Sequence, residues 1–254
     1  MGTSSSGRGP KNAAPLVPPW ADTDGGGPGA APADNRFTAF RINLGHFVSR
    51  GEHASLRRAL GHYARSSTGG AAVGPRRFGA MIQAGGALFS ALQDLREGGT
   101  GIAAVGVDFS ALRGTDTKVA IQELVRALTP PNGDAEKIQV AMQEALSQSL
   151  EGMTDFDPTQ ISDETLVKMM VAYIGDCVFK QITLDSDRAF QKADTLEKAV
   201  DAEGGLVLLI NSTVDKHMRP LFSSGLQTLS RSAVEEIQRR ALADVWVEWE
   251  AYDD

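Results

Sequence analysis

The residue with the most distinctive chemistry is Gly2, which directly follows the initiator Met1. Removal of a methionine ahead of so small a residue is expected to expose a glycine α-amine. That amine has a pKa of about 8, below the roughly 10.4 of lysine, so a useful fraction is unprotonated and nucleophilic at neutral pH. Because an amine without a side chain enters a narrow pocket, we predict that Gly2 is a modification site.

Two other interpretations of this terminus stay open. Gly2 and Ser6 match the Met-Gly-x-x-x-Ser pattern of N-myristoylation, which requires a host with that acyltransferase. A small second residue is also very common among proteins, so Gly2 alone identifies no reaction.

The remaining reactive side chains form no catalytic or metal-binding pattern. His46, His53 and His62 are seven and nine positions apart, which is too far for one ion on a single helix. Cys177 lies on an apolar helix face, which favours an inert core thiol over a nucleophile. We predict a non-enzymatic protein with no catalytic residue, no metal and no cofactor of its own.

Three weaker candidates lie in predicted loops. The acid pairs Asp155-Phe-Asp157 and Asp185-Ser-Asp187 resemble fragments of a calcium loop but lack its glycine and its distal glutamate, so helix capping is favoured. The loop Gly69–Gly74, followed by Arg76 and Arg77, offers a phosphate site at a helix N-terminus, but it is no Walker motif. A plain interhelical loop is the favoured interpretation.

The basic residues are unevenly distributed. Residues 36–78 contain eight arginines and one acid, a balance of 8 − 1 = +7, whereas the whole chain carries −7. Arginine binds carboxylates and phosphates through paired hydrogen bonds. We therefore predict that Arg36, Arg41, Arg57 and Arg58 contact a protein partner. Two alternatives stay open: the arginines face the chain's own acidic helices, or they bind nucleic acid.

The element that must position Gly2 is an N-terminal tail, residues 1–35. Seven glycines and six prolines lie in it without helical or strand periodicity, so we expect it to be disordered unless a partner binds. Within it, the run from Pro15 to Trp20 is biased to an extended polyproline conformation. We predict that Pro18, Pro19 and Trp20 dock on a partner. The alternative is that Trp20 packs back on the chain's own domain.

Residues 36–254 show apolar residues at helical spacing, with no run of strands and no internal repeat. We predict one all-α domain of about seven or eight helices, with a basic start at residues 36–78 and an acidic body at 79–254. Ser162 is expected to cap one helix, and Ser232 with Glu235 forms a capping box for the last. The predicted helices cover residues 36–51, 53–65, 76–96, 121–128, 138–150, 166–178, 206–221 and 232–249.

Composition adds two expectations about location. No stretch of about 18 apolar residues is present, so no membrane span is predicted. The single cysteine allows no disulfide within one chain, which fits a reducing cytoplasm.

Several short motifs, in their order along the chain, resemble the QatB family. This family is the small component of the Qat anti-phage defence system. The likeness is densest over residues 1–80, beyond which only a generic helical body is visible. The motifs are Met1-Gly2-Thr3-Ser4-Ser5-Ser6, Pro15-Leu16-Val17-Pro18-Pro19-Trp20, the arginine and aromatic run from Arg36 to Phe47, the run from Leu56 to Tyr63, and Gly69-Gly70.

The resemblance implies a bacterial operon with an ATPase, a TatD-like nuclease and a QueC-like enzyme of the QatC type. QueC-type enzymes use ATP to act on a carboxylated deazaguanine. In related defence systems such enzymes join the nucleobase to an N-terminal glycine through an amide. The implied role of this chain is acceptor: Gly2 would be modified, with Thr3 and Ser4 following it into the enzyme. The deazaguanine nucleobase would be a covalent modification supplied by the partner.

A rival hypothesis belongs to a different class. The chain would be a nucleic-acid-binding or scaffold adaptor that uses its arginine-rich segment to recruit the nuclease and ATPase. It predicts steeply salt-dependent binding to DNA or RNA, lost when Arg57 and Arg58 become acidic. A hydrolase is the weakest hypothesis, because no nucleophile–base pair or metal set is visible.

Overall fold

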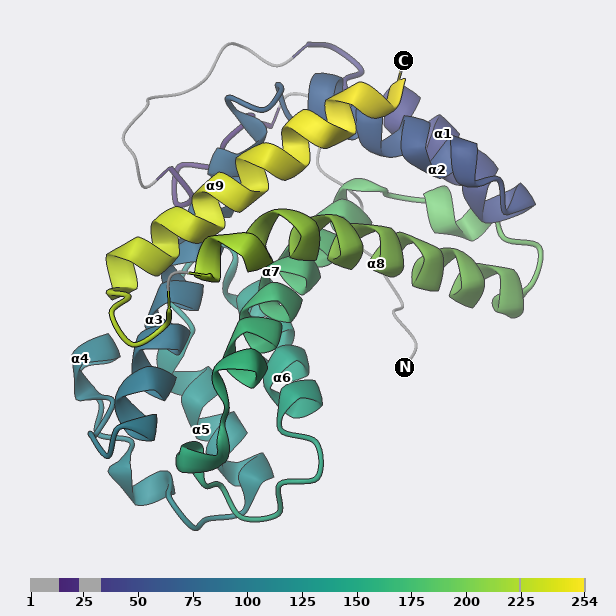
Figure 1. Ribbon diagram of the computed structural model, residues 1–254. Coiled ribbons are helices and arrows are strands. Elements are labelled where there is room, and N and C mark those ends of the chain that lie inside the picture. Colours follow the sequence, from purple (N-terminus) through teal and green to yellow (C-terminus); the bar gives the residue numbers. More distant parts are fainter. Residues whose placement is uncertain (1–13, 23–32, 224, 254) are drawn as a thin grey trace. The chain divides into compact units, whose positions relative to one another are not determined.

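The computed structural model describes residues 14–22, 33–223 and 225–253. In this part of the chain the secondary structure is helical, with a single isolated β-bridge between Asp116 and Asp155 and no strand (Figure 1). The all-α prediction is confirmed. The described residues contain nine α-helices: α1 (Thr38–Arg50), α2 (His53–His62), α3 (Gly79–Arg96), α4 (Ile102–Val105), α5 (Thr117–Leu128), α6 (Ala135–Ser149), α7 (Asp163–Asp185), α8 (Leu196–Met218) and α9 (Arg231–Glu250).

The helix that the sequence pattern misses is α4. It has only four residues and lies between Gly101 and Gly106, whose φ angles are 72° and 75°. Such left-handed angles favour glycine and end a helix at once. An element of one turn is too short to show apolar periodicity, so the sequence pattern contains no signal for it.

The helix N-terminal caps agree only in part with those predicted from the sequence. Ser162 accepts a hydrogen bond from the backbone N–H of Thr165 at 3.1 Å, as predicted. The last helix, however, starts at Arg231, and its cap is Ser230, which accepts from the N–H of Ala233 at 3.2 Å. The capping-box prediction for Ser232 and Glu235 is therefore wrong: the cap lies two residues earlier, because Ser230 also satisfies the Ser/Thr preference of a cap.

The described chain divides into two compact units. Unit 1 takes the chain up to Gly79, together with Val178–Thr213 and Ala241–Asp254. Unit 2 takes Ala80–Cys177 and Val214–Arg240. The boundaries expected at residues 35 and 78 stay predictions.

Unit 1 has an aromatic core. The rings of Phe40 and Tyr63 lie 5.0 Å apart, and Trp246 contacts Phe78 at 5.4 Å and Trp249 at 5.2 Å between ring centroids. The indole N–H of Trp246 donates to the Thr68 hydroxyl at 2.8 Å. Tilted and edge-on aromatic pairs of this kind stabilise a core beyond their buried area.

Unit 2 is held by buried polar contacts to the backbone of α3. Tyr173 donates to the carbonyl of Met81 at 2.8 Å, and Gln238 donates to that of Ile82 at 3.4 Å. Gly85 makes this close packing feasible, because a Cβ there would overlap the Gln238 side chain. Cys177 is buried in this unit, and burial raises the pKa of its thiol, as expected for an inert core cysteine.

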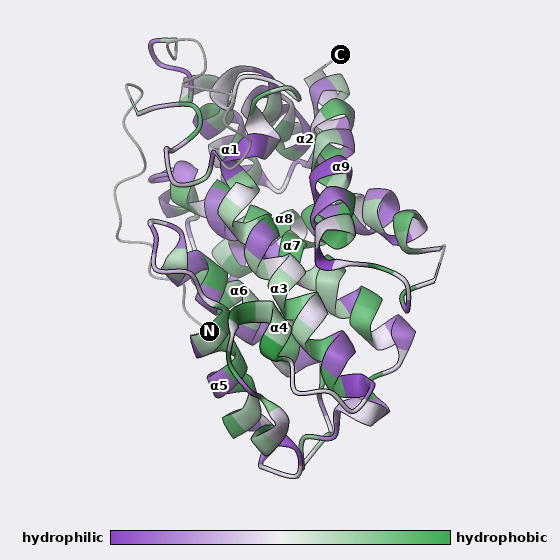
Figure 2. Ribbon diagram, turned by 90° about the vertical axis from the view of Figure 1, so that its left-hand side faces the viewer, coloured by the Kyte–Doolittle hydropathy of each residue, from purple (hydrophilic) through white to green (hydrophobic). Residues whose placement is uncertain are grey.

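Most helices carry both apolar and polar residues, as the hydropathy colours of Figure 2 show. None of the described helices combines the length and the apolarity that a membrane crossing requires.

Candidate functional site

Part of the predicted tail packs on unit 1. Residues 14–22, which we call the strap, bury the side chains of Leu16, Val17 and Ala21. The Leu16 methyl lies so close to Gly69 that a Cβ on that glycine would meet it at 3.1 Å. This part of the predicted tail is therefore held by contacts with its own chain. Leu16 and Val17, expected to offer apolar side chains to a partner, pack on their own chain.

The strap folds into a turn where an extended polyproline run was expected. The N–H of Ala21 donates to the carbonyl of Pro18 at 3.0 Å, which places Pro19 and Trp20 at the two central positions. Proline favours the first of these positions, because its fixed φ suits the turn. Trp20 remains 48% exposed. The turn thus presents the indole outward while its neighbours are buried.

An ion pair fixes the C-terminal end of the strap. Arg76 donates to the carboxylate of Asp22 at 2.8 Å, and both side chains are largely buried. Arg76 lies in the 3-10 turn Gly74–Phe78, directly after the glycine loop. The strap is therefore anchored at Leu16 and at Asp22, on either side of Trp20.

The glycine loop has internal roles. Gly69 and Gly70 have φ angles of 87° and 84°, which favour glycine. The N–H of Ala71 donates to the Glu250 carboxylate at 2.8 Å, and a Cβ on Gly74 would overlap the Trp246 indole. A carboxylate of the chain itself thus accepts the hydrogen bond of a loop N–H that a phosphate would otherwise take. These contacts support the interhelical-loop interpretation over a phosphate site.

A buried carboxylate organises the arginine-rich segment. Asp185 accepts hydrogen bonds from Tyr63 at 2.8 Å, Arg77 at 2.9 Å and Gln181 at 3.0 Å. Its backbone carbonyl accepts from Arg41 Nε at 2.9 Å. Burial and the nearby carboxylate hold the pKa of Tyr63 well above its ordinary value. Asp185 was expected to cap a helix, but it is the central carboxylate of this charge cluster.

Arg36 belongs to the same cluster. It is only 4% exposed, and its guanidinium lies 4.8 Å from the ring centroid of Phe37. Its Nε and Nη1 atoms are buried and have no hydrogen-bond partner among the described residues. Burial and the Arg77 cation lower the pKa of Arg36. Arg36 and Arg41 therefore face the chain's own residues, which was one of the alternatives for this segment.

Arg57 and Arg58 behave differently. Both are exposed on α2, and Arg57 lies over the ring of Tyr252 at 5.2 Å. The four predicted contact arginines are thus separated into an inward pair and an outward pair. Gly2, Thr3 and Ser4 lie outside the described residues.

Within the acid pair of unit 2, Asp157 has the predicted capping role. It accepts from the N–H of Thr159 at 3.0 Å at the start of a short 3-10 turn, and a hydrogen bond from the Thr159 hydroxyl is the largest cause that lowers its pKa. Among the described residues, no group of three or more His, Cys, Asp or Glu side chains is placed to hold a metal ion.

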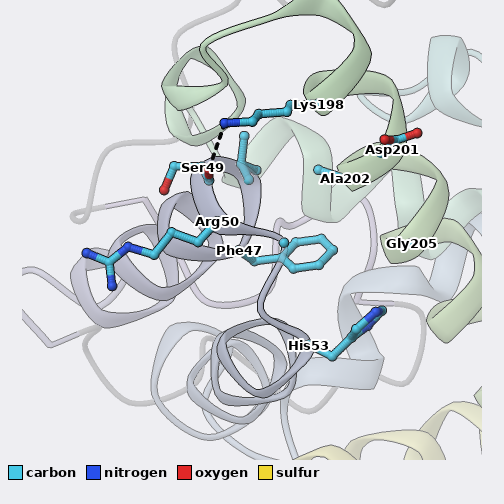
Figure 3. A pocket seen from close by; sticks show the side chains of 10 residues that line it. Phe47, Ser49, Arg50, His53, Lys198, Asp201, Ala202 and Gly205 are labelled. Atoms are coloured by element: carbon cyan, nitrogen blue, oxygen red, sulfur yellow. Dashed lines mark hydrogen bonds between the residues drawn. The ribbon is translucent and has the colours of Figure 1, made fainter.

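A pocket that sequence reasoning missed lies in unit 1, between the α1–α2 junction and α8 (Figure 3). Phe47 and Ala202 supply apolar surface, while Lys198 reaches across to donate to the carbonyl of Ser49 at 3.4 Å. The lining residues come from positions 47–53 and 198–205, so no single local sequence motif contains them. The remaining lining side chains belong to Val48, Arg50, His53 and Asp201. The pocket thus combines the charged side chains of Arg50, Lys198 and Asp201 with apolar surface.

Comparison with known proteins identifies the family. Searches among curated proteins and among solved structures return no match. A family model described as Qat anti-phage system associated protein QatB matches residues 69–248, more than half of the chain. The match confirms the resemblance, but it lies mostly beyond the motifs of residues 1–80 that carried it. The chain belongs to the QatB family of the Qat anti-phage system.

Proposed function

We propose that this chain serves anti-phage defence as a non-catalytic acceptor protein. In this proposal a QueC-like partner enzyme joins a deazaguanine to the α-amine of Gly2 after Met1 is removed. The amine nitrogen attacks the ATP-activated carboxyl carbon of the nucleobase and forms an amide. The activating group leaves with the electron pair of its C–O bond, and the nitrogen loses a proton. Membership of the QatB family supports the defence role and partners within that system.

The observation that carries the proposal is the anchored strap. Leu16 and Asp22 hold it on unit 1, while the turn presents Trp20 at 48% exposure. A half-exposed tryptophan on a fixed turn offers large contact area at low entropic cost, as docking residues do. Pro18 and Pro19 shape this turn and remain part of the proposed docking element.

The strap also limits the reach of the amine. An unanchored tail of 35 residues would extend to about 120 Å, whereas Leu16 lies only 14 positions after Gly2, a span of at most about 50 Å. A shorter tether raises the effective concentration of the amine near a docked partner. The partner that holds Trp20 would therefore be the enzyme that receives Gly2.

A pair of glycine substitutions tests the acceptor role. In cells that carry the whole Qat system, Gly2→Glu is expected to abolish both the N-terminal modification and phage protection. Gly27→Glu makes the same chemical change in the tail beyond the strap and is expected to keep both. If Gly2→Glu retains modification and protection, Gly2 is not the acceptor.

The docking role of the strap has its own test. Trp20→Ala is expected to reduce the modified fraction at least ten-fold while leaving the thermal unfolding of the chain unchanged. Full modification of the Trp20→Ala protein at limiting enzyme would exclude Trp20 as a docking residue.

A further inference from the structure

Helix α8 carries a row of exposed apolar residues. Leu196, Val200 and Leu208 are 81%, 58% and 71% exposed, and Gly204 completes the row between them. These positions are four residues apart, so they are neighbours on one side of the helix. The row runs for about 18 Å along the axis. Single exposed apolar residues are ordinary on a protein surface, but a contiguous row marks an interaction site.

The opposite side of α8 is already occupied. Ala202, Leu206 and Ile210 are buried and supply the apolar contacts of this helix with its own chain. An amphipathic surface helix needs only one such face. The second face, formed by the exposed row, therefore takes little part in the packing of the described residues of unit 1. Figure 1 shows the course of α8 (light green).

Two adjacent glycines separate the roles of the faces. A Cβ on Gly205 would meet the Phe47 ring at 3.0 Å, so this glycine permits close packing within the chain. A Cβ on Gly204 would meet nothing within 4 Å. Glycine weakens a helix interior, and no contact of the described chain requires it at position 204. Close approach of another backbone to this face would give Gly204 a role.

Carboxylates flank the exposed row. Glu197 and Glu203 lie three residues before and after Val200, and Asp201 lies three residues before Gly204. The one cation of this stretch, Lys198, pairs with Asp194 at 2.9 Å. A second copy of the chain packed on this row would bring acid against acid, which opposes association. Charge complementarity instead favours an occupant with lysine or arginine beside its apolar residues.

We propose that the exposed row of α8 binds an amphipathic helix of another protein, with apolar residues at helical spacing and basic residues along both edges. Such a helix would lay its apolar face on Leu196, Val200 and Leu208, with its backbone close to Gly204. Its basic residues would pair with the flanking carboxylates. This surface is independent of Gly2 and Trp20, so the proposal does not rest on the acceptor function.

Site-specific photo-cross-linking tests this surface in cells that carry the whole Qat system. Leu208 is replaced by p-benzoyl-phenylalanine, and Val119, another exposed apolar residue on a helix, receives the same replacement as a matched control. The expected adduct forms only from position 208 and maps to a helical segment with basic edges in another protein. An adduct with a second copy of the chain, an adduct with a segment that lacks basic edges, or no adduct above the control would overturn the proposal.

Substitution provides a second measurement. The pair Val200→Gln and Leu208→Gln is expected to reduce recovery of the cross-linked partner by at least ten-fold in pull-down, whereas Val119→Gln leaves it unchanged. Because these side chains are exposed, the variants should unfold at the same temperature as the parent. Unchanged recovery from the double variant would contradict docking on this row.

Discussion

The arginines of residues 36–78 form two populations with opposite surroundings. Arg36, Arg41 and Arg77 gather around the buried Asp185, and the Arg77–Asp185 ion pair is almost fully enclosed. Arg57 and Arg58 are exposed on α2. In sequence both populations belong to one basic run. The difference shows that a basic run in the sequence does not reveal which of its arginines the chain pairs with its own carboxylates and which it leaves exposed.

The largest expected effect comes from removal of that carboxylate. Asp185→Ala leaves the Arg77 guanidinium buried without its counter-ion, and breaking a buried pair from one side costs about 3–5 kcal/mol. Asp194→Ala removes an exposed partner of Lys198 and is expected to cost less than about 1 kcal/mol. Urea unfolding of both variants measures the difference. Equal losses would show that the two environments do not differ energetically.

The buried cluster also predicts loss of stability in alkali. The pKa of Tyr63 is raised in the folded chain, so the unfolded chain releases this proton first as the pH rises. The stabilisation is complete below about pH 10 and declines above it, by up to about 1.4 kcal/mol per pH unit for each such group. Tyr173, buried in unit 2, contributes in the same direction.

The variant Tyr63→Phe is expected to reduce this alkaline slope of the unfolding free energy between about pH 9 and 11. Tyr173→Phe provides the corresponding comparison in unit 2. An unchanged slope in Tyr63→Phe would contradict the assignment of its proton to the buried cluster.

The two glycines of α8 allow a comparison with a smaller expected effect, because a methyl group added at Gly204 meets open space and one added at Gly205 meets the chain itself. Gly204→Ala faces open space and is expected to raise stability by about 0.5–1 kcal/mol, the usual helix preference for alanine. Gly205→Ala brings a methyl group against Phe47 and is expected to gain less or to lose stability. Thermal unfolding of the two variants measures each change in stability. A greater gain for Gly205→Ala than for Gly204→Ala would contradict the assignment of Gly205 to the packed face and Gly204 to the open face.

The smallest effect on stability is expected at the exposed arginines. Arg57→Glu with Arg58→Glu should change the unfolding free energy by no more than about 1 kcal/mol, because surface substitutions rarely exceed this. The same double variant tests the nucleic-acid hypothesis. We expect no binding of the parent chain to DNA or RNA at low salt. Steeply salt-dependent binding that the double variant abolishes would favour the adaptor hypothesis.

The sequence was most informative about the helices. Long apolar repeats predicted α5 to α9 to within a few residues at most ends, although α8 starts ten residues before Leu206, where the predicted helix began. Its first turns carry Leu196 and Val200 outward, so they lack the inward periodicity on which the prediction depended. Periodicity detects a helix by the face that packs in the chain, and these first turns bury few residues.

The sequence was less informative about contacts between distant residues. Asp185 and Arg77 are 108 positions apart in the sequence. Phe47 and Lys198, which line one pocket, also lie far apart in the sequence and share no motif. Composition likewise gives no indication that Leu16 and Val17 occupy buried positions, with Leu16 beside the glycine loop. Local propensity carries no information on such tertiary partners.

The intact mass of the chain, purified from cells that express the whole Qat system, tests the acceptor function most directly. The proposal predicts loss of Met1 and a gain in mass equal to an amide-linked deazaguanine, which peptide fragmentation places on Gly2. The gain should disappear when the QueC-like partner is absent. An unmodified Gly2 in the presence of the active partner would contradict the account.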